Sequence, residues 1–173
     1  FEAYMHNGGS RQYGYGIDFM KTNRPAVNPP EPPAVDVVST MYPSVEGIIK
    51  LATQEGETRP VLMCEYAHAK GNALGNHQEY WNAVKKYPRL IGGYIWDWVD
   101  QSFREIDADG RWYWTYGGDY GPKNVPSFGN FCCNGLVNAV REPHPHLLEV
   151  KKAYQYIKAT LVDKSNLTLN IKN

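Results

Sequence analysis

Three short apolar runs, separated by segments with helical periodicity, constrain the fold of this chain more than any other feature. None of the runs alternates polar and apolar residues, so each is predicted to be a strand that is buried on both faces. Strands that alternate with helices pair in parallel through right-handed crossovers, which predicts an α/β fold. The strands are expected at 35–38, 60–64 and 90–96, and the helices at 45–54, with Ser44 as N-cap, and at 77–86.

Polar residues stand where the predicted strands end. Glu65 follows the second strand, and Asp97 follows the third. In a (β/α)8 barrel, the carboxyl ends of the strands form the edge that carries the active site. Such a barrel takes about 250 residues, whereas this chain has 173 and is expected to supply about four strands. The sequence therefore predicts the second, C-terminal half of a TIM barrel.

The chain divides into three parts. Glycine and proline dominate residues 1–34, which predicts an irregular loop or linker. Residues 35–157 hold the partial barrel, including a hairpin around Asp109-Gly110 and a helix that begins near Pro145. In residues 158–173, apolar side chains alternate on both sides of a polar turn, which predicts two strands of a different, antiparallel unit.

Composition argues against several classes of protein. Lys and Arg number 18, as do Asp and Glu, so the basic surplus of a nucleic-acid-binding protein is missing. No apolar run approaches the roughly 18 residues of a membrane-spanning helix. No signal peptide is recognised, and three cysteines without a CxxC pair favour reduced thiols, so we expect a cytoplasmic protein, with the periplasm as the alternative. Because the first residue is Phe rather than Met, we expect a processed product or an excised piece.

Glu65 is the strongest candidate for chemistry. Its carboxylate would face the mouth of the barrel, where it can attack the anomeric carbon of a sugar. The alternative is a structural glutamate that caps the next turn or pairs with Arg59 or Lys70. His68 can bind a substrate hydroxyl or orient Glu65, or it can be an ordinary structural histidine.

Other polar and aromatic residues suit sugar recognition. The chain has 13 tyrosines and 5 tryptophans, whose flat apolar faces and polar edges match a pyranose. Trp96 would stack on a sugar ring, unless it packs under the helices. Asn134 offers its amide to a hydroxyl or to a hard cation. His144 and His146 flank a proline without a third metal ligand, so loop histidines are the simpler interpretation.

Several longer motifs occur in a fixed order between about residues 36 and 156. They are Met41-Tyr42, Arg59-Pro60, Cys64-Glu65-Tyr66-Ala67-His68-Ala69 with Gly71-Asn72, Tyr87-Pro88-Arg89-Leu90, the run from Gly92 to Gln101, Tyr116-Gly117-Gly118-Asp119 and Phe131-Cys132-Cys133-Asn134-Gly135-Leu136-Val137. Together they resemble the β-galactosidases of glycoside hydrolase family two. The resemblance implies the C-terminal part of the catalytic barrel, with the first strands of the following β-sandwich domain at 158–173.

The resemblance also implies roles for individual residues. Glu65 matches the catalytic nucleophile, and Tyr42 matches a tyrosine that hydrogen-bonds to it. His68 matches a histidine that holds galactose hydroxyls, and Trp96 matches the indole on which galactose stacks. The implied substrate is a terminal β-galactoside such as lactose, and the implied intact protein is a homo-oligomer.

The implied cofactors are sodium and magnesium. Asn134 and the carbonyl of Phe131 match sodium ligands, and the magnesium ligands belong to a part of the family's chain that precedes these motifs. The family's acid/base glutamate lies in an Asn-Glu pair, which does not occur in this sequence. We therefore expect the remainder of the parent chain to be a required partner, and the chain alone to be inactive.

Two other functions stay open at this point. A non-catalytic carbohydrate-binding module would use Trp96, His68 and Asn134 without turnover. A Cys-His hydrolase would use Cys64 and His68, but strand parity places Cys64 on the opposite face from Glu65.

Overall fold

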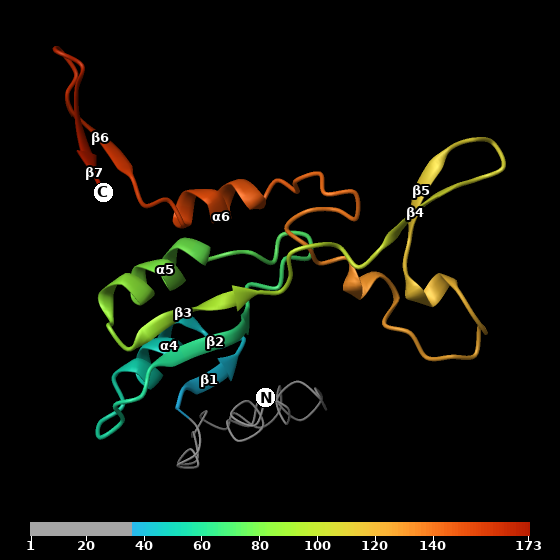
Figure 1. The fold of residues 1–173 in the computed structure, drawn as a ribbon, viewed down its shortest axis with the longest axis horizontal. Coiled ribbons are helices and arrows are strands. Elements are labelled where there is room, and N and C mark those ends of the chain that lie inside the picture. Colours follow the sequence, from blue (N-terminus) through green and yellow to red (C-terminus); the bar gives the residue numbers. More distant parts are fainter. Residues whose placement is uncertain (1–35) are drawn as a thin grey trace.

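A computed structural model describes residues 36–173, so the linker expected at 1–34 lies outside the described residues. Three parallel strands form a sheet in the order β1-β2-β3, and helices connect them, as the sequence predicted. The two connecting helices pack on one face of the sheet, and α6 packs on α5 (Figure 1). These elements are β1 (Val38–Met41), α4 (Val45–Ala52), β2 (Val61–Tyr66), α5 (His77–Lys86), β3 (Leu90–Ile95) and α6 (Leu147–Ala153).

The strand boundaries differ from the expected ones by a few residues. β1 begins at Val38 rather than at residue 35, because its ladder with β2 begins where Val38 pairs with Val61. β2 runs one residue past Glu65, so this glutamate lies within the strand and not after it. β3 ends at Ile95, one residue earlier than expected.

The described residues place three strands in the parallel sheet, not the four expected. The sequence predicts no position for a fourth strand; beyond β3, Val137 makes an isolated parallel bridge to Val99. The segment around Val137 bonds to the irregular stretch after β3, with Leu136 N–H donating to Asp97 O at 3.0 Å. A continuous ladder with β3 does not form there because β3 has already ended.

Side chains fix both ends of α4. Ser44 is the N-cap, as predicted, and its Oγ accepts the amide three residues on at 3.0 Å. At the other end, the Arg89 guanidinium donates to the carbonyls of Leu51 (3.2 Å) and Ala52 (3.0 Å), and also to Arg59 O (2.8 Å). These bonds satisfy final helix carbonyls, which helps to explain why α4 ends two residues earlier than expected.

The main core lies between the sheet and helices α4 and α5. β2 and β3 approach closely at Gly93, where an added Cβ would lie 2.7 Å from the Cβ of Met63, so only glycine fits. The buried residues of this core are Val38, Ile48, Leu51, Ala52, Val61, Met63, Tyr66, Ala83 and Leu90.

A cluster of rings joins β2 to α5 and α6. The hydroxyl of Tyr66 accepts from Trp81 Nε1 at 2.9 Å and lies 2.9 Å from the hydroxyl of Tyr154. His77, at the start of α5, packs edge-on against both tyrosines and is only 2% exposed. Within residues 36–173, neither ring nitrogen of His77 has a hydrogen-bond partner.

Two hairpins project from the packed unit (Figure 1). β4 (Phe103–Ile106) pairs with β5 (Trp112–Thr115), and β6 (Lys158–Asp163) pairs with β7 (Thr168–Lys172), both antiparallel as predicted. Two short 3-10 helices, Gly117–Asp119 and Gly129–Cys132, lie in the loop after β5. Assignment of residues 158–173 to a separate β-sandwich domain stays a prediction.

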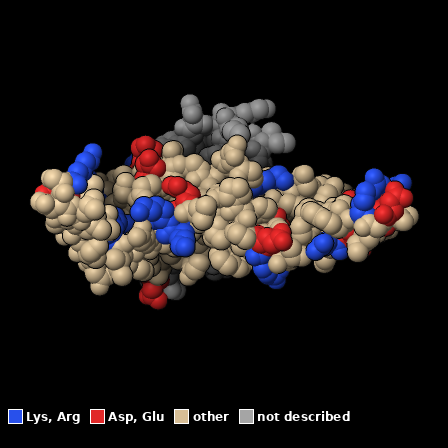
Figure 2. All heavy atoms as spheres, turned by 90° about the horizontal axis from the view of Figure 1, so that it is seen from above, with Lys and Arg blue, Asp and Glu red and all other residues tan. Residues whose placement is uncertain are grey.

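The surface carries mixed charge. On the face shown in Figure 2, Lys and Arg side chains are interspersed with Asp and Glu. In the part of the chain that the structure describes, no helix has the length and apolar character needed to cross a membrane.

Candidate active site

Tyr42 and Glu65 meet at the carboxyl end of the sheet. Tyr42 directly follows β1, and its backbone N–H donates to the carbonyl oxygen of Glu65 at 2.9 Å. The Tyr42 hydroxyl also hydrogen-bonds to the Glu65 carboxylate. Burial raises the pKa of the Glu65 carboxyl, and the hydrogen bond from Tyr42 opposes this rise because it favours the charged form. We call this pair the Tyr42–Glu65 corner.

The backbone is strained on both sides of the corner. Tyr42 has a φ of 47° and Ala67 a φ of 50°, values in the left-handed region that non-glycine residues rarely adopt. The ladder between β1 and β2 also shifts register between Thr40 and Met41. Left-handed non-glycine residues cost about 1–3 kcal/mol each and cluster at functional sites. The strain therefore marks these strand ends as the place to look for function.

Asn134 is the centre of a second group of polar contacts. Its side chain is buried, and in one orientation of its amide both the oxygen and the nitrogen have hydrogen-bond partners. In that orientation, Oδ1 accepts from Trp96 Nε1 (3.1 Å) and His68 Nε2 (3.2 Å), and Nδ2 donates to the Cys132 carbonyl (3.0 Å). Asn134 thus joins two loops that follow β2 and β3. We call Asn134, Trp96 and His68 the Asn134 hub.

Ring contacts bring the hub and the corner together. His68 stacks on Phe131, with ring centroids 4.7 Å apart and planes 29° apart. On another side, the ring of Tyr42 lies 6.2 Å from that of His68. The backbone adds a further link, because Ala69 N–H donates to Trp96 O at 2.8 Å. The residues that the sequence singled out for catalysis and for sugar binding therefore form one site.

The surroundings of the His68 imidazole lower its pKa, which favours the neutral form. Burial lowers its pKa, the nearby Lys70 ammonium lowers it further, and the Asp97 carboxylate opposes them. When Nε2–H donates to Asn134, Nδ1 is left as an acceptor. A neutral imidazole in this state can accept a hydrogen bond from a sugar hydroxyl.

The Asn134 amide is also where a sodium ion was expected. One end of the Asn134 amide lies 3.0 Å from the Cys132 carbonyl oxygen. Hydrogen bonding assigns the nitrogen, Nδ2, to that end. An oxygen at that position would need a cation between the two oxygens, and such oxygens suit a hard cation. The hub orientation puts the amide nitrogen at that end, so the described contacts do not identify Asn134 and the Phe131 carbonyl as sodium ligands, and the sodium site stays a prediction. Residues 36–173 contain no group of three or more His, Cys, Asp or Glu side chains placed to hold a metal.

Several candidate contacts from the sequence are not made. The Cys64 thiol donates to the Thr40 carbonyl at 3.3 Å, while His68 bonds to Asn134, so the described contacts do not form a Cys-His pair. The cations considered as partners for Glu65 have other partners. Arg59 pairs with Glu57 at 2.5 Å, and Lys70 donates to the Asn130 carbonyl at 2.5 Å.

Sequence reasoning missed the support behind Asn134. His144 and His146 looked like ordinary loop histidines, yet one bonds to Asp100 at 2.7 Å and the other to Gly135 O at 3.0 Å. The available signal was the position of Asp100, inside the run from Gly92 to Gln101. Only the structure shows that residues 100 and 135 are neighbours.

A parallel α/β sheet with polar residues at its carboxyl edge is found in TIM-barrel enzymes and in doubly wound α/β enzymes. Comparison with known families defines the chain further, because residues 31–159 match the model of the glycosyl hydrolases family 2, TIM barrel domain. The chain therefore belongs to glycoside hydrolase family two, and its three-stranded sheet is part of that barrel domain.

Curated relatives carry the name Beta-galactosidase. The chain is 48% identical over 149 residues to the protein of that name from Klebsiella pneumoniae, covering 80% of this chain and 14% of the relative. It is 44% identical over 152 residues to the Beta-galactosidase of Aeromonas hydrophila, and the match covers 82% of this chain and 15% of that relative. It is 47% identical over 140 residues to the Beta-galactosidase of Psychromonas ingrahamii, and the match covers 81% of this chain and 13% of that relative. The chain thus spans about one seventh of the length of these relatives.

Proposed function

We propose that this chain forms the nucleophile side of the active site of a retaining β-galactosidase. The observation that carries the proposal is the Tyr42–Glu65 corner, a partly buried carboxylate held by a phenol at the carboxyl edge of a family-two barrel sheet. The Asn134 hub lies beside it and provides the groups that recognise a sugar. The names of the relatives point to galactose as that sugar.

Glu65 acts as the nucleophile in this proposal. Its carboxylate attacks the anomeric carbon, the glycosidic oxygen leaves with a proton from an acid, and a galactosyl ester forms on Glu65. Water then hydrolyses the ester and regenerates the carboxylate. The Tyr42 hydroxyl favours the charged carboxylate, which keeps Glu65 ready for attack and improves it as a leaving group in the second step.

The hub binds the galactose ring. The Trp96 indole offers a flat apolar face for stacking, and its N–H is fixed by Asn134. His68 Nδ1 accepts from a galactose hydroxyl. The Asn134 amide oxygen and the Phe131 carbonyl would hold a sodium ion, which would supply a positive charge near the sugar hydroxyls, and the magnesium ligands are expected in another part of the intact protein.

The acid/base carboxyl comes from outside the described residues. A retaining mechanism needs two carboxyl groups about 5–5.5 Å apart. The carboxylates nearest by motif are engaged elsewhere, since Asp97 accepts from Val99 N–H at 2.8 Å and Asp119 from Tyr116 N–H at 2.9 Å. Because the full sequence also lacks an Asn-Glu pair, the chain by itself is inactive in this proposal, and it works as the C-terminal half of a barrel that the rest of a longer, homo-oligomeric protein completes.

The decisive test is covalent labelling of the intact protein that contains this chain. A 2-fluoro galactoside with a good leaving group forms a slowly hydrolysed ester on the nucleophile, and peptide mapping should find it on Glu65. A matched 2-fluoro glucoside controls for sugar specificity. A label on another residue would contradict the assignment, and binding without any label or turnover would favour the carbohydrate-binding module.

The isolated 173-residue chain provides a second test. Assayed on a nitrophenyl β-galactoside, it should give no turnover above that of its own Glu65→Gln variant. Loss of general acid catalysis alone removes about 10²–10⁴-fold of the rate. Clear turnover would show that the second carboxyl lies within these residues after all.

A further inference from the structure

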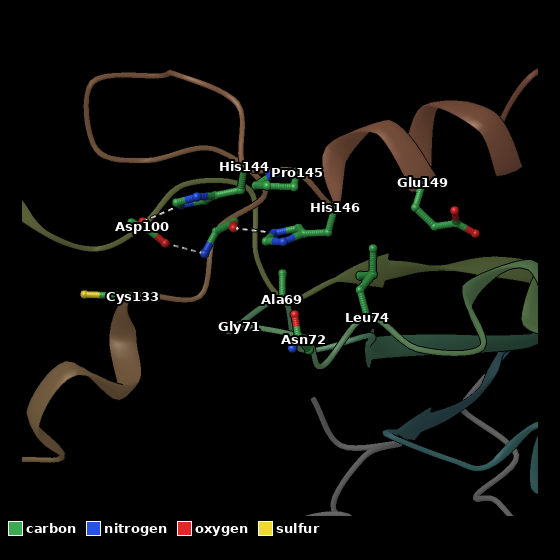
Figure 3. A pocket seen from close by; sticks show the side chains of 11 residues that line it. Ala69, Gly71, Asn72, Leu74, Asp100, Cys133, His144, Pro145, His146 and Glu149 are labelled. Carbon is green, nitrogen blue, oxygen red and sulfur yellow. Dashed lines mark hydrogen bonds and ion pairs between the residues drawn. The ribbon is translucent and has the colours of Figure 1, made fainter.

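The backbone of Gly135 is held by two side chains from outside its own loop, and a third side chain supports one of them. Its N–H donates to Asp100 Oδ1 at 2.7 Å, and its carbonyl accepts from His146 Nε2 at 3.0 Å. The other oxygen of Asp100 accepts from His144 Nε2 at 2.7 Å. Figure 3 shows these contacts beside a pocket of about 550 Å³, with both histidines on the segment that leads into α6. We call Asp100, His144 and His146 the Gly135 clamp.

The clamp is closely fitted to the backbone. A Cβ on Gly135 would lie 2.2 Å from the backbone nitrogen of Asp100 and 2.4 Å from the carbonyl carbon of Val99, so only glycine fits here. The Asp100 side chain is 11% exposed, and the imidazole rings of His144 and His146 stack with centroids 5.4 Å apart. Packing this tight leaves Gly135 little room to move.

Gly135 directly follows Asn134, so its placement sets where Asn134 lies. On the other side of the hub, Asp97 N–H donates to Asn134 O at 2.9 Å. Asn134 is 2% exposed, and its amide oxygen holds both the Trp96 indole and the His68 imidazole. A displacement at residue 135 would therefore move the two side chains that face the substrate.

We propose that Asp100, supported by His144, is a positioning residue that places Asn134 and, through it, Trp96 and His68 for substrate binding. Asp100 touches no substrate in this proposal and acts only through the backbone of Gly135. The inference rests on the proposed function for its effect on turnover, but the contact chain itself is independent of the substrate.

A double-mutant cycle in the intact protein tests the proposal. Asp100→Ala should lower kcat/KM for a nitrophenyl β-galactoside by about tenfold, the loss expected when Asn134 itself is removed, because displaced binding groups hold the substrate less well. In an Asn134→Ala background, Asp100→Ala should lower kcat/KM by less than about twofold, because the side chain through which Asp100 acts is already absent. Equal losses in both backgrounds would overturn the proposal, because a merely structural role gives additive effects.

Two further variants separate positioning from folding. Asp100→Asn should recover most of the activity, because its amide oxygen still accepts from Gly135 and its NH₂ can donate to a His144 that carries its proton on Nδ1. Asp109→Asn, on the exposed β4–β5 turn, is the matched control and should leave kcat/KM unchanged.

Hydrogen–deuterium exchange gives a readout that needs no activity. Exchange in a peptide spanning residues 131–138 should rise in Asp100→Ala and in the milder His144→Ala, but not in Asp109→Asn. Unchanged exchange would refute the clamp, whatever the protein hydrolyses. A wild-type protein that hydrolyses no galactoside would instead refute the proposed function, with the exchange result still deciding on the clamp.

Discussion

The Tyr42–Glu65 corner and the Asn134 hub are built in opposite ways. Corner residues lie at or directly after the ends of adjacent parallel strands, and backbone ladder bonds hold them. Hub residues lie on three loops, at 68, 96 and 134, and side-chain hydrogen bonds hold them. The group proposed for bond breaking is thus fixed by the sheet, whereas the groups proposed for recognition depend on one buried amide. Substitutions in the two regions should therefore affect different kinetic constants.

Glu65→Gln in the intact protein should have the largest effect. Glutamine keeps the shape of the side chain but cannot form the ester, nor can its neutral amide stabilise an oxocarbenium-like transition state. We expect kcat to fall by about 10⁴-fold or more, with galactose binding by calorimetry retained. The exposed Glu55→Gln is the control. A Glu65→Gln variant within tenfold of the wild-type rate would break the distinction between the two regions.

Tyr42→Phe should have the next largest effect, again on kcat. Loss of one hydrogen bond to the reacting group costs about 10²-fold in comparable sites. The hydrogen bond lowers the Glu65 pKa against the effect of burial. Without this hydrogen bond the Glu65 pKa rises. When the solution is acidified, the Glu65 carboxylate therefore takes up its proton at a higher pH. The acid limb of the pH–rate profile should therefore move to higher pH, and it should not move in the exposed Tyr94→Phe.

Asn134→Ala should act mainly on KM, by about tenfold, because the interactions lost are made in the ground state as well as in the transition state. The labelling rate of Glu65 at saturating inhibitor should change much less. A sodium titration should stimulate wild-type protein and affect the variant weakly. Asn124→Ala, in the exposed loop after β5, is the control. A loss confined to kcat would show that the hub belongs to the chemical step.

His77→Phe lies in neither region and should change stability alone. It removes two buried nitrogens that lack partners among the described residues, and each such group costs about 1–3 kcal/mol. We expect the free energy of unfolding to rise by about 1 kcal/mol with kcat unchanged.

The same substitution should alter the pH dependence of stability. Burial lowers the pKa of folded His77, although Glu149 and Glu79 oppose this. The unfolded chain binds the proton more readily, so stability falls as pH drops below about 6.5, the ordinary histidine value. The difference in Tm between pH 8 and pH 5.5 should therefore be smaller in His77→Phe. A difference as large as in wild type would assign the effect to other groups.

Much of the corner was predictable from sequence, and much less of the hub. Apolar runs and helical periodicity are local signals, so they located the strands, α5 and the end of β2 near Glu65. The left-handed φ of Tyr42 and its bond to Glu65 depend on pairing between β1 and β2, which no local pattern encodes.

The hub depends on longer-range contacts. Family resemblance singled out His68, Trp96 and Asn134, but their mutual hydrogen bonds join segments up to 66 residues apart. The role of Asp100 was missed because its partners, Gly135 and His144, follow it by 35 and 44 residues. Periodicity carries no information at such separations.

The left-handed backbone at Tyr42 and Ala67 bears on how this protein evolves in the laboratory. A library screened for heat resistance alone would favour Gly or Asn at these positions, because both tolerate a positive φ. A variant selected with Gly or Asn at residue 42 would lose the phenol that holds Glu65. Selection for stability and selection for turnover therefore pull position 42 in opposite directions. A thermostabilised variant should be sought elsewhere, with this residue kept as tyrosine.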